Sequence, residues 1–275
     1  MLIQAFRRGF HHESLAASLK RHTVPELKSI AIQSGVNVTG TKPEVINRLV
    51  DCFEQSQKQQ TRSVLSFDLG YRNLAYCHLD RDANIIDWAR IDLNLTSFHP
   101  SAIAPVVRTL VQTHLSDPLK AADKVLIEQQ RARTGGSHNV LEATMRVNCV
   151  EAILWTSLYD AIDQLNRAKQ IEMLPILRQR VDRLWQTELD RVTAENVETF
   201  SKAKSNYYLK KQASSLLVQN WLDTNTMVNC NESFRAMYEQ EKKKDDLSDC
   251  LMQALAWFRW EKYTKETCSL YLEKE

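Results

Sequence analysis

Three lysines run directly into a cluster of aspartates near the C-terminal end of the chain, in the segment K-K-K-D-D-L-S-D. The apolar residues after it have helical spacing, so Asp246 and Asp249 are expected in the first turn of a helix and on one face of it. Two carboxylates this close repel each other unless a cation lies between them. The pair therefore indicates either a divalent-metal site or acidic capping of the positive helix end. Asp245 is turned by about 100° from Asp246 around the helix, and we expect it only to cap.

Two further acids lie at the ends of short apolar runs that have the character of buried strands. Alternation along S-V-L-S-F-D-L-G puts Asp68 on the face opposite the large apolar side chains, and Glu128 ends the run K-V-L-I-E. Taken singly, each acid is better explained structurally: Asp68 as a turn residue before Gly70, and Glu128 as a surface acid at the end of a strand. Together with Asp246 and Asp249 they can converge on one site, provided that the later helix packs on the sheet.

The elements around these acids indicate an α/β fold. Residues 63–92 contain three strand-like runs, which are close enough in sequence to form an antiparallel meander. A helix from about 102 to 115 then leads to residues 124–128, which resemble a buried parallel strand reached by a helical crossover. Residues 166–192 are expected to form additional helices interrupted at Pro175.

Composition narrows the class of protein. The 275 residues are 43% hydrophobic and 25% charged, and no apolar run is long enough to cross a bilayer. The formal net charge of +2 does not indicate nucleic-acid binding, so local clusters of basic residues must carry that argument. The first residues contain Arg7 and Arg8 among apolar residues and no acid before Glu13, which is typical of a mitochondrial presequence.

Residues 19–54 predict a small helical module. Thr23, Pro25 and Glu26 form a helix-start signature, Gly35 ends that helix, and a second helix begins near Thr41. The pattern T-V-x-E-L-K, then G-V, then T-G-x-K-x-E-V-x-x-R-L resembles the SAP motif, a DNA-binding helix pair. The resemblance implies phosphate contacts from Lys28, Lys42 and Arg48; the alternative is a helical hairpin with solvated charges.

The larger domain also resembles a known family. D-x-G after the first strand, E on the fourth and D-x-x-D opening the last helix are similar to the RuvC-like branch of the RNase H-like superfamily. The blocks F-D-L-G-Y-R-N-L-A-Y-C, I-E-Q-Q-R-A-R-T-G, M-R-V-N-C-V-E-A-I-L and K-K-D-D-L-S-D resemble the fungal mitochondrial Holliday-junction resolvases. Gln129 and Ala132 depart from that pattern, at positions where we expect a basic and an aromatic residue.

The resemblance implies a homodimeric, Mg²⁺-dependent endonuclease that resolves four-way DNA junctions in mitochondria by paired symmetric nicks. The fold implied is an RNase H-like mixed five-stranded sheet flanked by helices, in residues 63–275, after a presequence in 1–18 and the SAP-like module in 19–54. The catalytic and metal-binding residues would be Asp68, Glu128, Asp246 and Asp249, because four carboxylates suit two hard cations; Mn²⁺ can substitute for Mg²⁺.

Several basic residues lie where they can contact DNA. The candidates beside the acids and in a basic, tyrosine-containing stretch are Arg131, Arg133, Lys204, Lys210, Lys242, Lys243 and Lys244. The alternative for each is a solvated charge. The helix from Asn139 to Leu165 is the predicted dimer interface, since apolar residues cover more than one side of it: Leu141, Met145, Ile153, Leu154, Leu158 and Ile162.

Two rival functions remain open from the sequence. One is another RNase H-like nuclease, for instance one that cuts RNA in RNA–DNA hybrids. The other is a non-catalytic, SAP-bearing DNA architectural protein, against which the intact acids argue.

Overall fold

The computed structural model describes residues 12–57, 60–130, 142–165, 170–196 and 206–273. The chain divides into two compact units. The terminal unit comprises residues 1–60, 179–186 and 256–275, and the sheet unit comprises residues 61–178 and 187–255. Within the described ranges, no helix has both the length and the apolar character needed to cross a membrane.

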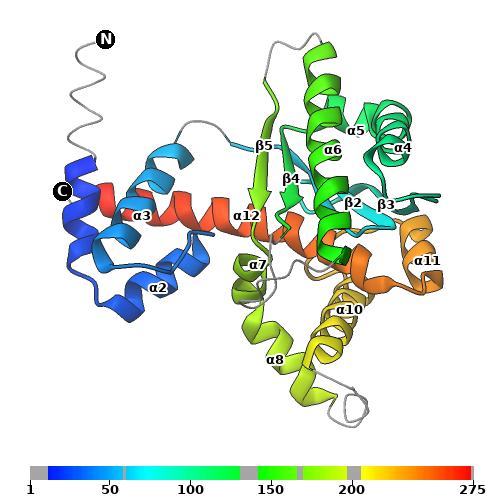
Figure 1. The fold of residues 1–275 in the computed structure, drawn as a ribbon. Helices are drawn as coiled ribbons and strands as arrows, with labels where there is room; N and C mark the ends of the chain where they lie inside the picture. Colours follow the sequence, from blue (N-terminus) through cyan, green and yellow to red (C-terminus); the bar gives the residue numbers. More distant parts are fainter. Residues whose placement is uncertain (1–11, 58–59, 131–141, 166–169, 197–205, 274–275) are drawn as a thin grey trace. The chain divides into compact units, whose positions relative to one another are not determined.

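The terminal unit is helical (Figure 1). Residues 12–20 form a helix, followed by α2 (Val24–Gln33) and α3 (Lys42–Ser56). Capping boxes open both named helices, the first as predicted and the second at the predicted start: the Thr23 and Thr41 amides each donate a 2.7 Å hydrogen bond to a glutamate three residues later. Their apolar faces share a core with Cys268 of the last helix.

The sheet unit contains a five-stranded mixed sheet in the order β3-β2-β1-β4-β5. β1 (Ser63–Leu69), β2 (Asn73–Asp80) and β3 (Ile85–Asp92) form the antiparallel meander expected from the sequence. α4 (Pro100–Thr113) and α5 (Ser116–Ala121) then lead to β4 (Lys124–Glu128), which pairs parallel with β1. The predicted α/β fold, with its meander and helical crossover, is thus confirmed.

The fifth strand lies where only helices were expected. β5 (Glu172–Ile176) pairs parallel with β4, and α7 (Arg178–Leu184) and α8 (Gln186–Glu195) follow it. The expectation of helices throughout 166–192 is therefore wrong for residues 172–176. A strand so short has little periodicity, and Pro175 argues against a central strand; a proline is tolerated here because β5 lies at the sheet edge.

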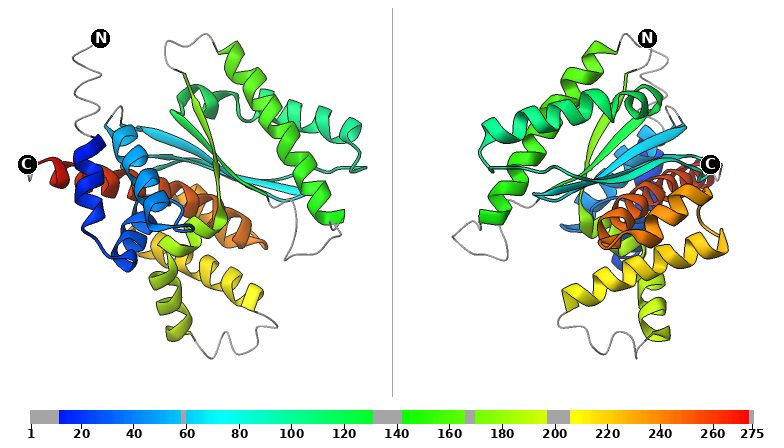
Figure 2. Two further views of the ribbon diagram at one scale, coloured as in Figure 1. Left: turned by 60° about the vertical axis from the view of Figure 1, so that its left-hand side comes forward. Right: turned by 90° about the vertical axis from the view of Figure 1, so that its right-hand side faces the viewer.

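Helices cover both faces of the sheet (Figure 2). One face packs against α4 and α6 (Glu142–Gln164) through a core that includes Leu65, Phe67, Val107 and Leu154. On the other face lie the first part of α12 (Lys244–Leu272), together with α10 (Asn206–Thr224) and α11 (Glu232–Gln240). The apolar alternation of β1 thus leaves the face that carries Asp68 to α12.

Candidate active site

Strand alternation and register bring Asp68 and Glu128 together. Phe67 of β1 pairs with Ile127 of β4, and both side chains belong to the core under α4 and α6. Paired residues on parallel strands point to the same face, so the next residues along, Asp68 and Glu128, both point to the opposite face. Glu128 lies close enough to Asp68 to raise its pKa, second only to burial. The two strand-end acids therefore form one group on the α12 side of the sheet.

A buried glutamine holds α12 against the strands that carry these acids. Gln253 is 4% exposed, and its amide nitrogen lies 2.9 Å from Ser66 Oγ and 3.3 Å from the carbonyl oxygens of Phe67 and Leu126. A second hydrogen bond comes from β3: the indole nitrogen of Trp88 donates to the Leu247 carbonyl at 3.2 Å. The first turns of α12 are thereby fixed relative to the ends of β1 and β4.

A stacked aromatic pair supports the same helix start. The rings of Trp88 and Tyr238 stack with centroids 5.1 Å apart. The Tyr238 hydroxyl donates to the Ser215 carbonyl at 2.9 Å and lies 2.8 Å from Ser248 Oγ, which links α10, α11 and α12. Burial, as the largest cause, raises the pKa of Tyr238, so the hydroxyl stays protonated and able to donate.

Asp249 joins the two strand-end acids, accompanied by an arginine. The side chain of Asp249 is 11% exposed and forms a two-pronged ion pair with Arg178, with Nη2 donating to Oδ1 at 2.7 Å. Burial, then Glu128 and then Asp249 raise the pKa of Asp68 well above its ordinary value, and the nearby Arg178 charge opposes them. Three of the four predicted acids thus lie within electrostatic reach of one another.

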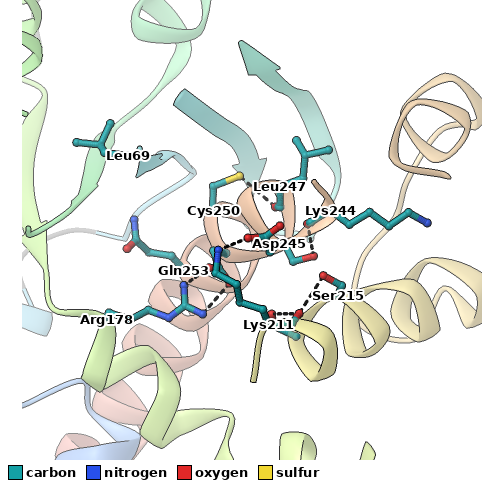
Figure 3. A network of polar contacts seen from close by, with 12 residues as sticks. Leu69, Arg178, Lys211, Ser215, Lys244, Asp245, Leu247, Cys250 and Gln253 are labelled. Atoms are coloured by element: carbon teal, nitrogen blue, oxygen red, sulfur yellow. Dashed lines mark hydrogen bonds and ion pairs between the residues drawn. The ribbon is translucent and has the colours of Figure 1, made fainter. Parts of the chain in front are cut away.

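Asp246, the fourth predicted acid, is held by a different arginine. Arg90 of β3 donates from Nε to Asp246 Oδ2 at 3.0 Å and also pairs with Glu241 at 3.5 Å. Burial, followed by the adjacent Asp245, raises the pKa of Asp246, while Arg90 and Lys211 lower it. Asp245 itself pairs with Lys211 of α10, in addition to its expected place in the first turn of α12 (Figure 3).

A fifth acid near the site was not anticipated from the sequence. Glu151 of α6 accepts a 3.3 Å hydrogen bond from the Gln130 backbone amide, two residues after Glu128. Burial, as the largest cause, raises the pKa of Glu151, and Glu128 adds to the rise. Glu151 occurs within one of the four blocks that resemble the resolvases, but its position in a long helical run gave no separate signal.

The chemistry of this donor set fits a hard divalent cation. Carboxylate oxygens are the ligands that Mg²⁺ prefers. The pKa of Asp68 is raised first by burial and then by the neighbouring carboxylates, whose repulsion a cation would relieve. As the described side chains stand, no three of their acids, histidines or cysteines are arranged to ligate one ion. Asp249 and Asp246 point instead to their arginines.

The basic residues singled out from the sequence fall into three groups. Lys242, Lys243 and Lys210 are exposed, whereas Lys244 lies over the Tyr238 ring at 5.0 Å. In the terminal unit Lys28 is exposed, while Lys42 and Arg48 donate to the backbone carbonyls of Lys20 and Thr39. Arg131, Arg133 and Lys204 lie outside the described residues, as does Leu141 of the predicted interface helix.

The predicted interface helix, α6, has two apolar sides. Val150, Leu154 and Leu158 are buried toward the sheet. On the other side Met145 is 62% and Tyr159 54% exposed. Trp155 is partly buried against the core and also contacts Tyr159, with ring centroids 6.1 Å apart. Ile153 and Ile162, also expected at an interface, pack against the buried core instead.

Comparison with known proteins points to one family. The family model described as mitochondrial resolvase Ydc2 / RNA splicing MRS1 matches residues 64–239. Two curated relatives, both called cruciform cutting endonuclease 1, mitochondrial, are similar over most of their length. The Schizosaccharomyces pombe protein is 27% identical over 90% of this chain and 97% of its own. The Saccharomyces cerevisiae protein is 25% identical over 86% of this chain and 81% of its own.

A solved structure agrees in fold. The crystal structure of the yeast mitochondrial Holliday junction resolvase Ydc2 aligns with a TM-score of 0.64 at 22% identity, covering 92% of this chain and 99% of that one.

Proposed function

Because the chain belongs to the family of the mitochondrial resolvase Ydc2 and the RNA splicing protein MRS1, we propose that it is a mitochondrial endonuclease that resolves four-way DNA junctions. The observation that carries the proposal is the cluster of Asp68, Glu128 and Asp249 at the strand ends. A binding protein has no need of an aspartate whose pKa is raised by burial and by two neighbouring carboxylates. The curated relatives bear names for cutting cruciforms, which contain four-way junctions.

The nuclease is magnesium-dependent. Asp68, Glu128 and Asp249 would hold Mg²⁺, with Asp246 completing the set, and Mn²⁺ can take the same oxygen ligands. When bound, the metal activates a water for attack on the phosphodiester and stabilises charge on the leaving oxygen. Gln253 and Trp88 keep α12 seated on the strands, so that Asp249 stays beside the strand-end acids.

The exposed lysines supply the electrostatic contacts with DNA. Lys242 and Lys243 precede the acids of α12, where they can bind phosphates next to the cut, and Lys210 on α10 is exposed as well. Arg131, Arg133 and Lys204 are proposed to contact DNA on the basis of the sequence. Such contacts position the duplex arms and carry little base specificity.

Residues 19–54 of the terminal unit are proposed to be a SAP-like module that adds sequence-independent affinity. Lys28 is exposed on α2 and free to face a phosphate backbone. Lys42 and Arg48, which already donate to backbone carbonyls, can offer their remaining donors to DNA. Deleting residues 1–57 should then weaken junction and duplex binding alike; a loss confined to junctions would contradict a sequence-independent role.

A homodimer would supply two active sites for the two strands that must be nicked. On the side of α6 away from the sheet, the exposed Met145 and Tyr159 lie 14 residues apart, which is about four helical turns, and Trp155 packs against Tyr159; this arrangement suits helix pairing. Tyr159→Glu should shift the protein from dimer to monomer in light scattering and turn paired nicks into single nicks. Gln164→Glu, exposed elsewhere on α6, is the matched control. A dimer unchanged by Tyr159→Glu would exclude this interface.

The test of the function is cleavage of a labelled four-way junction beside a linear duplex and an RNA–DNA hybrid, with Mg²⁺. The proteins compared are wild type, Asp68→Asn and a control, Asp117→Asn, whose carboxylate is 91% exposed on α5. Symmetric nicks confined to the junction and lost only in Asp68→Asn are expected. Hybrid cutting would make the protein another RNase H-like nuclease. Junction binding without cutting would favour an architectural role. Tight binding of structured RNA without any cutting would favour the RNA-splicing role that also appears in the description of the family.

A further inference from the structure

Arg178 reaches the carboxylate cluster from the start of α7, two residues after β5, the strand that was not predicted from the sequence. Ile176 of β5 is in register with Glu128 of β4, and its carbonyl accepts a 2.9 Å hydrogen bond from the Gln129 amide. Arg178 follows two residues later and opens α7. Because β1, β4 and β5 are parallel neighbours, their carboxyl ends lie at the same end of the sheet. Arg178 therefore lies at the end of the sheet that carries Asp68 and Glu128.

The guanidinium uses both of its terminal nitrogens on one carboxylate. Nη2 donates to Asp249 Oδ1 at 2.7 Å, and Nη1 pairs with Asp249 Oδ2. The Arg178 side chain is 29% and that of Asp249 11% exposed, so the pair is screened only in part by water. In Figure 3 the Arg178 side chain extends toward α12, close to the labelled Gln253.

The arginine also acts on the rest of the cluster. Its charge lowers the pKa of Asp68, against the larger effects of burial and of Glu128. Arg178 thus places a positive charge beside the carboxylate cluster, and this charge belongs to a protein side chain and not to a metal ion. A guanidinium is always charged and matches a carboxylate in a fork, so it holds Asp249 in a defined orientation.

This geometry competes with direct metal ligation by Asp249. The fork of Arg178 takes one of the two lone pairs on each Asp249 oxygen, so a hard divalent cation would have to use the remaining lone pairs directly beside a positive charge. We propose that Arg178 is a cationic placeholder: it keeps Asp249 beside Asp68 and Glu128 in the metal-free protein, and a divalent cation must displace at least one of its two hydrogen bonds to bind. The inference rests on the proposed function only in that these carboxylates hold a divalent ion.

The consequence is a measurable competition. Removing the guanidinium frees Asp249 for the ion and removes the positive charge that the ion must replace. Arg178→Gln should therefore bind Mn²⁺ or Mg²⁺ about tenfold more tightly than wild type, the factor that corresponds to one charge-assisted hydrogen bond. The same variant should be less stable than wild type without metal, because the acids then lack their neutralising partner.

The experiment measures ion binding to the full-length protein without DNA, by calorimetry and by Mn²⁺ paramagnetic resonance. Wild type is compared with Arg178→Gln and Arg178→Lys, and with Arg191→Gln as control, because Arg191 makes an exposed pair with Glu195 on α8. Circular dichroism establishes that each variant is folded. Arg178→Lys keeps the charge but loses the fork, so it should recover metal-free stability while binding the ion with intermediate affinity. If Arg178→Gln does not fold, this lysine variant alone decides the matter.

The outcomes separate the inference from the function on which it rests. Tighter ion binding by Arg178→Gln, or by Arg178→Lys, with Arg191→Gln unchanged, supports the placeholder. Equal or weaker ion binding by both Arg178 variants overturns it and leaves the metal site standing. Absence of ion binding in wild type and variants alike overturns the metal site, and the placeholder with it.

Discussion

Replacing Gln253 by methionine should uncouple α12 from the strands that bear the acids. The amide nitrogen of Gln253 faces three acceptors, Ser66 Oγ at 2.9 Å and the carbonyls of Phe67 and Leu126 at 3.3 Å. An amide group carries only two N–H hydrogens, so at most two of these contacts are full hydrogen bonds. Methionine is similar in length and shape and cannot donate, so the change removes the bonds while leaving the packing largely intact.

The expected loss of stability follows from that count. Two net hydrogen bonds contribute about 2 kcal/mol, and leaving the fully buried Ser66 oxygen without its donor adds up to about 1 kcal/mol. We therefore expect the free energy of unfolding to fall by about 2–3 kcal/mol. For a unit of this size the melting temperature should drop by about 4–10 °C.

Urea unfolding followed by circular dichroism measures the stability, and junction cleavage with Mg²⁺ measures the consequence for the site. The control is Gln112→Met on the exposed side of α4, which should change neither quantity. Cleavage should fall more than junction binding, because Phe67 directly precedes Asp68 and the helix carries Asp249. A Gln253→Met protein within about 0.5 kcal/mol of wild type, the range of ordinary surface substitutions, would refute this reasoning.

Three further predictions concern other parts of the chain. Without metal, Asp68→Asn should be more stable than wild type at neutral pH, and urea unfolding from about pH 4 to pH 8 should show the difference growing with pH. The reason is that burial and a neighbouring carboxylate raise the pKa of Asp68 in the folded state, so wild-type stability falls as pH rises through that raised pKa. An advantage of Asp68→Asn that is independent of pH would contradict this. Tyr238→Phe loses a carbonyl and a serine partner at 2.9 and 2.8 Å and should cost about 1–2 kcal/mol by the same assay; a neutral result would mean that the stacking alone holds α11. Gly35→Ala should destabilise the protein by about 2–4 kcal/mol in thermal unfolding, since φ is +66° and the new Cβ would lie 2.5 Å from a ring carbon of Trp260; an unchanged melting temperature would show that both adapt.

Much of the fold follows from local patterns in the chain. The capping boxes at Thr23 and Thr41 are short-range hydrogen bonds between residues three apart, so sequence spacing suffices to predict them. The meander likewise joins neighbours in sequence. β5 could not be predicted from the sequence, because a five-residue edge strand with a proline shows no clear apolar periodicity. The segment becomes a strand only by pairing with β4.

The residue types of the site and the faces on which they lie follow from the amino-acid sequence: Asp68 lies opposite the apolar side of its strand, and the D-x-x-D pair lies in the first turn of a helix. The charged partners of these acids, in contrast, follow from the three-dimensional arrangement. Arg90 and Arg178 lie 156 and 71 residues away from the aspartates that they hold. Electrostatic pairing acts over a few ångströms of space irrespective of distance along the chain, so no local pattern encodes these partners.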